Sequence, residues 1–103
     1  MTMAADFAPF QDGHVRLAVL QLLDGSAGYT ANNQVLRMGV EAMGLACTGD
    51  QLRGHLTWLE EQRLVTTVAL GSGVVVATLT ERGADVAAGR SVLSGVQRPA
   101  PGG

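Results

Sequence analysis

The chain contains no lysine, so its positive charge comes entirely from seven arginines. Charged residues make up only 16% of its 103 residues, well below the quarter that is typical of globular domains. Its net charge is −2, so it lacks the broad positive field of proteins that bind nucleic acid without sequence preference. A surface with few charges also favours self-association or a partner-binding face, although fourteen glycines and many alanines dilute every other residue class.

Cysteine and histidine are almost absent. The single cysteine, Cys47, excludes an internal disulfide and agrees with a reducing compartment. One cysteine and two histidines are too few for a metal site of defined spacing. The sequence offers no catalytic triad or paired carboxylates, and Gly71 and Gly73 match a hairpin turn rather than a phosphate-binding G-x-x-x-x-G-K-[ST] loop. We therefore expect no metal, no cofactor and no enzymatic activity.

No apolar run approaches the roughly 20 residues that a membrane-spanning helix needs. The first residues also lack the basic start and apolar centre of a secretory signal. We therefore expect a cytoplasmic protein with no membrane partner. The length allows one domain with a modest core. We expect this domain to span residues 7–90, between a flexible N-terminus at residues 1–6 and a flexible C-terminal arm at residues 91–103.

The stretch from Thr48 to Thr80 organises the rest of the chain. Thr48 and Gln51 have the spacing of a capping box, which predicts a helix start. Leucines at helical spacing then form one apolar stripe: Leu52, Leu56 and Leu59. The pattern next becomes β-branched, and Gly71-Ser72-Gly73 separates two predicted strands as a hairpin turn. A further short helix is predicted from Glu81.

An earlier helix is predicted from about residue 7, or from a cap at Asp12, to about Leu23. Its apolar face is wide and comprises Phe10, Leu17, Leu20 and Leu23, with Val15, Val19 and Leu22 beside them. The turn that follows leads to Tyr29-Thr30, which we expect to form a short strand beside the hairpin.

A second helix is predicted from a cap at Asn32 or Asn33 to a left-handed end at Gly44. We expect its interior face to hold Val35, Leu36, Val40 and Met43. A short turn at residues 45–47 then leads directly into the capped helix at Thr48. Helix, tight turn and capped helix are the order of a helix-turn-helix.

The run WLEEQRLV, a hairpin and LTERGADVAAGR resembles the recognition helix, wing and LTxxG segment of winged-helix regulators of the ArsR, MarR and PadR types. Residues 7–98, including the GVQRP tail, are most similar to small winged-helix proteins of Mu-like phages and prophages. The resemblance implies an α+β fold: a single winged helix-turn-helix domain with a three-helix core, a two-stranded wing and a short C-terminal helix. It also implies a phage origin, and therefore the host cytoplasm, but no established activity.

DNA binding as a dimeric phage regulator is the first functional hypothesis. Candidate contacts to double-stranded DNA are Gln51, Arg53 and Thr57 on the third helix, with Arg37 and Ser72 on the phosphate backbone. Two carboxylates share the outward face of that helix, and no charged residue occurs from residue 64 to residue 80. Groove binding is therefore disfavoured rather than excluded.

A protein–protein adaptor in a phage assembly or packaging complex is the alternative hypothesis. Such a chain would keep the winged-helix fold without binding DNA, and its partner would be a second copy or another phage protein. The interface candidates are Trp58, Val74, Val76, Arg98 and Pro99. For Trp58 a structural role, packing against the wing or the first helix, competes with this one. For His55, at the margin of the leucine stripe, we expect a hydrogen-bonded boundary position.

Overall fold

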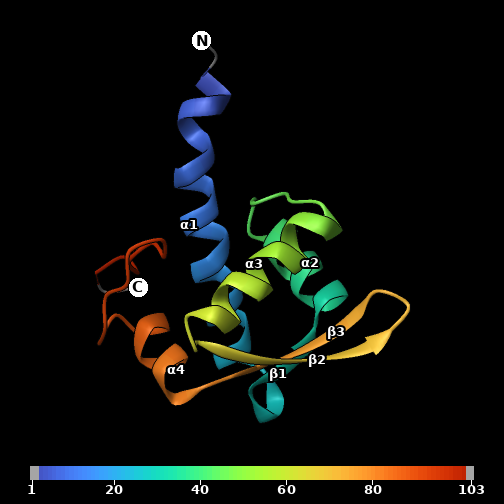
Figure 1. Ribbon diagram of the computed structural model, residues 1–103. Coiled ribbons are helices and arrows are strands. Elements are labelled where there is room, and N and C mark those ends of the chain that lie inside the picture. Colours follow the sequence, from blue (N-terminus) through green and yellow to red (C-terminus); the bar gives the residue numbers. More distant parts are fainter. Residues whose placement is uncertain (1–2, 102–103) are drawn as a thin grey trace.

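The computed structural model describes the backbone of residues 3–101 and the side chains of residues 11–101. The fold is α+β, as expected, and its elements follow the order α1 (Met3–Asp24), η1 (Ala27–Tyr29, a 3₁₀ turn), β1 (Thr30–Asn32), α2 (Asn33–Ala42), α3 (Gly49–Glu61), β2 (Val65–Gly71), β3 (Val74–Leu79) and α4 (Glu81–Ala87). The strands form one antiparallel sheet in the order β1-β3-β2. Helices α1, α2 and α3 lie over one face of this sheet (Figure 1).

Helix α3 begins where the sequence predicts. The Thr48 hydroxyl accepts a hydrogen bond from the Gln51 backbone N–H at 3.0 Å, and the Gln51 side-chain Oε1 accepts one from the Thr48 backbone N–H at 2.9 Å. This capping box stabilises the helix start by about 1 kcal/mol. The predicted leucine stripe is at most 1% exposed in all its members: Leu52, Leu56 and Leu59. The buried stripe fixes which face of α3 remains outward.

The hairpin between β2 and β3 also forms as predicted. Ser72 and Gly73 have φ angles of 55° and 76°, and positive φ at both central residues matches the twist of two antiparallel strands. Along β3, Ala77 and Leu79 are buried toward the helices. Because side chains alternate along a strand, Val74 and Val76 point to the opposite, outer face of the sheet.

Two expectations for α2 are wrong. Leu36 and Val40 are buried as predicted, but Val35 is 54% exposed and Met43 is 49% exposed. The helix has only ten residues and contacts the core through one narrow stripe. Val35 lies about 100° around the axis from Leu36, and Met43 follows the helix as its C-cap.

The first helix is longer than predicted. Helix α1 begins at Met3 and includes residues 3–6, which the sequence assigns to a flexible N-terminus. The expected packing of Phe10 lies outside the described side chains. Within residues 3–101 no helix combines the length and apolar character that crossing a membrane requires.

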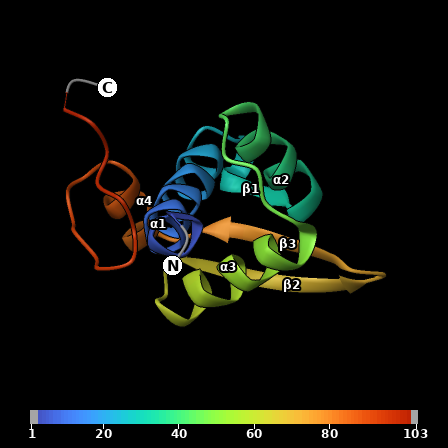
Figure 2. The same cartoon turned by 90° about the horizontal axis from the view of Figure 1, so that it is seen from above.

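The C-terminal segment from residue 91 to residue 101 returns to α1 (Figure 2). The Gln97 N–H donates to the Gly13 carbonyl at 3.1 Å. Val96 is only 8% exposed and Leu93 packs against the core, whereas Val92 remains exposed. At least part of the predicted C-terminal arm is therefore docked on the domain.

Candidate functional site

A half-open groove of about 360 Å³ lies between α2, the start of α3 and the tip of the β2–β3 hairpin. It brings together three of the five DNA-binding candidates from three separate elements: Arg37, Arg53 and Ser72. The remaining lining residues are Asn33, Gln34, Met38, Gly49 and Gly73. The groove is therefore polar, and its two positive charges come from arginine.

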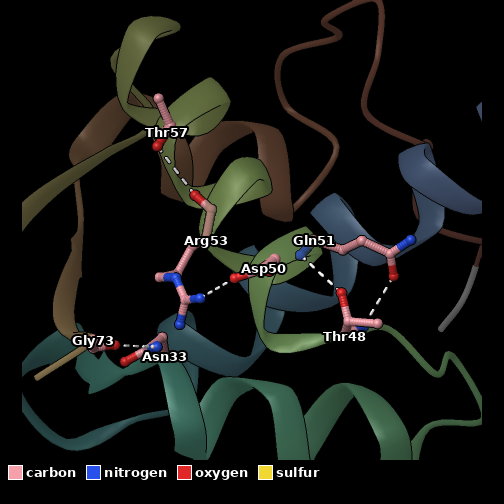
Figure 3. Close-up of polar contacts among 7 residues, drawn as sticks. All are labelled: Asn33, Thr48, Asp50, Gln51, Arg53, Thr57 and Gly73. Carbon is pink, nitrogen blue, oxygen red and sulfur yellow. Dashed lines mark hydrogen bonds and ion pairs between the residues drawn. The ribbon is translucent and has the colours of Figure 1, made fainter.

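Each arginine in the groove is paired with a carboxylate of its own helix. Arg53 pairs with Asp50, three residues earlier, and its Nη1 would lie 3.7 Å from a Cβ added at Gly73 (Figure 3). The Arg37 Nη1 lies 3.6 Å from the Glu41 carboxylate, four residues later. The groove thus presents two guanidinium groups whose charges are locally balanced.

Asn33 holds the hairpin tip against the start of α2, a role that the sequence analysis does not identify. Its Nδ2 donates to the Gly73 carbonyl at 2.9 Å, and its Oδ1 accepts from the Val75 N–H at 2.9 Å. Asn32 caps α2 by accepting from the Val35 N–H. The sequence has two successive asparagines at this helix start, and capping needs only one of them. The second asparagine was therefore the signal for another role.

The other two DNA-binding candidates lie outside the groove. Gln51 completes the capping box and points away from Arg53 (Figure 3). It lines a separate hollow of about 190 Å³ with residues of α1 and the α2–α3 turn. Thr57 lies one turn beyond Arg53 on the exposed face, and its hydroxyl donates to the Arg53 carbonyl at 3.1 Å. Of the three DNA-binding candidates on α3, Arg53 is therefore the one that lines the groove.

The smaller hollow contains His55, which is 8% exposed. Its Nδ1 accepts from the Arg16 Nε at 3.2 Å, and its Nε2 lies 3.6 Å from the Asp12 carboxylate. Burial lowers the pKa of His55 and Arg16 lowers it further, while Asp12 opposes them. A neutral imidazole with its proton on Nε2 satisfies both neighbours. The expected hydrogen bond of His55 is confirmed, but the side chain is buried rather than at the boundary.

Cys47 lines the same hollow. Burial raises the pKa of the Cys47 thiol; Arg37 opposes this effect and Glu41 adds to it. The protonated thiol is a poor nucleophile and a poor metal ligand. Within residues 11–101 no three histidine, cysteine, aspartate or glutamate side chains gather closely enough to hold a metal ion.

The interface candidates lie on separate surfaces. Trp58 is half-buried beneath the Arg16 guanidinium, which is 4.0 Å from the ring centroid. A Cβ added at Gly95 would lie 2.7 Å from the same ring, so the C-terminal segment contacts Trp58 directly. Val74 and Val76 belong instead to the outer face of the sheet. The two candidates in the C-terminal segment follow Gly95: Arg98 and Pro99.

The sequence is 44% identical to Uncharacterized protein gp26 of Escherichia phage Mu over 87 residues, which cover 84% of this chain and 88% of that protein. The chain belongs to the family of phage Mu gp26. An Uncharacterized protein of Haemophilus influenzae (strain ATCC 51907 / DSM 11121 / KW20 / Rd) is 43% identical over 67 residues, 65% of each chain. No protein-family model matches the chain, and no solved structure matches it. The expected similarity to Mu-like phage proteins is confirmed.

Proposed function

We propose that this chain is a winged-helix DNA-binding module that acts as a small phage regulator. Its order of elements, with a three-stranded sheet β1-β3-β2, is the order that winged helices share. In this assignment α2 and α3 form the helix-turn-helix, α3 enters the major groove of DNA, and the β2–β3 hairpin is the wing. Membership of the phage Mu gp26 family supports a phage setting.

The observation that carries the proposal is the convergence of Arg37, Arg53 and the hairpin tip on one groove. Guanidinium groups bind phosphate oxygens through paired N–H donors. Gly49, the first residue of α3, lines the same groove, where the positive end of the helix dipole favours an anion. A DNA phosphate beside this groove would position the outward face of α3 over the bases.

The outward face of α3 offers a small number of groups for reading bases. Gly54 is exposed with no neighbouring atom within 4 Å of an added Cβ, so the helix backbone can approach DNA closely there. Thr57 is exposed and carries a hydroxyl that can bond to base edges. Gln51 is also exposed, but its side-chain oxygen accepts from the Thr48 N–H and the side chain points away from Arg53. Arg53 can bind either a base or a phosphate.

Fluorescence anisotropy of a labelled mixed-sequence duplex, titrated at several salt concentrations, tests the proposal. The protein should bind at low salt and lose affinity as salt rises, because binding displaces counterions. Arg53→Ala should reduce the slope of log K against log salt by about one. Arg82→Ala is the matched control. Arg82 lies in α4, and its side chain donates to the Gln62 carbonyl, which is not part of the groove. No binding at low salt, or equal losses in both variants, contradicts the proposal.

A protein–protein adaptor remains the second candidate, and the outer face of the sheet favours it. Val68 pairs with Val76 across the sheet and is 60% exposed. Leu70, at the irregularity of β2 before the hairpin tip, is 65% exposed. Exposed apolar side chains grouped in this way are typical of contact surfaces. Replacing both residues with Thr should abolish partner binding in an adaptor while leaving DNA binding unchanged. If the partner is a second copy of this chain, sedimentation velocity over a concentration series should show the loss of the dimer in the double variant.

A further inference from the structure

Asp50 pairs with Arg53, one of the two arginines that line the groove. The two side chains are joined by a hydrogen-bonded ion pair, and 90% of the Asp50 side chain is exposed, against 39% of the Arg53 side chain (Figure 3). Asp50 belongs to the first turn of α3, and its partner Arg53 lines the groove. The carboxylate therefore holds the Nη2 of the guanidinium, while Nη1 lies toward Gly73.

A carboxylate and a phosphate oxygen compete for the same guanidinium donors. An exposed ion pair is weak enough to be exchanged, but the displaced carboxylate then stays close to the phosphate and repels it. The cost of this exchange is the same at every DNA sequence, whereas base contacts differ between sequences. Such a pair therefore lowers the affinity for DNA of any sequence more than a carboxylate that is not paired with a phosphate-binding arginine.

We propose that Asp50 is a specificity-determining residue that masks Arg53 against non-specific phosphate binding. Every phosphate contact of Arg53 then carries the cost of breaking the ion pair, and base contacts from α3 offset that cost at a specific site. This inference rests on the proposed DNA-binding function. Glu41 stands in the same relationship to Arg37, although its pair is longer, at 3.6 Å.

The test compares Asp50→Asn with Glu61→Gln in the full chain. Both changes remove one negative charge from the exposed face of α3, but only Asp50 pairs with Arg53. With the labelled mixed-sequence duplex, Asp50→Asn should strengthen binding about twofold to fivefold, the range expected from an exposed ion pair. Its salt slope should change little, because Arg53 contacts a phosphate in both chains and only the cost of breaking the ion pair is removed. Glu61→Gln should change affinity less than twofold.

An Arg53→Ala background completes the cycle. There Asp50→Asn should have the same small effect as Glu61→Gln, because no arginine remains to be unmasked. Circular dichroism should show unchanged helix content for both variants, since Thr48 still caps α3. Equal responses of Asp50→Asn and Glu61→Gln in the native background would overturn the inference alone. If neither the native chain nor Asp50→Asn binds duplex DNA at low salt, the proposed function fails and this inference fails with it.

Discussion

The guanidinium carbon of Arg16 lies 4.0 Å from the centroid of the Trp58 ring, and the same group donates hydrogen bonds to His55 and to the Gly95 carbonyl. One side chain of α1 therefore links α3 to the C-terminal segment. The arrangement combines a partly desolvated cation–π contact with two hydrogen bonds. It explains why Trp58, an interface candidate from sequence, is instead half-covered within its own chain.

Replacing Arg16 with Met should detach the C-terminal segment while keeping an apolar side chain against Trp58. We expect a loss of about 1–3 kcal/mol in the free energy of unfolding, from the cation–π contact and the hydrogen bonds. Hydrogen exchange of the Val96 and Gln97 amides should accelerate, because the Gln97 N–H bonds to the Gly13 carbonyl of α1 and the Val96 N–H bonds to the Leu93 carbonyl within the docked segment. Arg82→Met is the control and should leave these amides protected. Unchanged protection in Arg16→Met would contradict this account.

Stability should decrease as pH falls below about 6.5. The folded-state pKa of His55 lies below its ordinary value, chiefly because of burial and then because of Arg16. The unfolded chain therefore binds a proton more readily, and the contribution of His55 to stability is full above about pH 6.5 and declines between that value and the lower folded-state pKa. Urea unfolding at a series of pH values measures this decline. His55→Gln should remove it, and a decline of equal size in that variant would assign it to other groups.

Gly83→Ala should be strongly destabilising. A Cβ at this position would lie 2.0 Å from the Leu64 carbonyl oxygen, which cannot move away easily because it accepts hydrogen bonds from the Thr80 N–H and hydroxyl. Helix α4 would have to shift, at a cost of about 3 kcal/mol or more. Thermal unfolding measures the change, and a melting temperature within 3 °C of the native chain would exclude such a close approach.

Gly54→Ala should have the opposite effect. Gly54 lies inside α3 and is exposed, with no neighbouring atom within 4 Å of an added Cβ. Alanine reduces the freedom of the unfolded chain without a clash, so we expect a gain of about 0.5–1 kcal/mol. The same thermal unfolding experiment measures it, with Gly83→Ala as the contrasting glycine. A destabilised Gly54→Ala variant would indicate a contact that the folded monomer does not contain.

Local signals in the sequence determined the elements themselves. The capping box of Thr48 and Gln51, the leucine stripe and the Gly-Ser-Gly turn each depend on residues no more than four positions apart along helix or turn. Over that distance the local helix or turn geometry alone fixes which side chains share a face and which groups can form hydrogen bonds. The α+β class and the hairpin could therefore be predicted. The close contact at Gly83 could not, although the LTxxG resemblance pointed to this glycine.

The tertiary structure decided which of these residues meet. Asn33 bonds Gly73 across 40 residues and Arg16 bonds Gly95 across 79, and no periodicity in the sequence relates such positions. The same holds for the groove, where Arg37, Arg53 and Ser72 converge from three elements. The exposure of Val35 and Met43 depends on how narrowly α2 contacts its neighbours. DNA binding stays a prediction, because the placement of side chains defines a surface, and a binding measurement identifies what that surface binds.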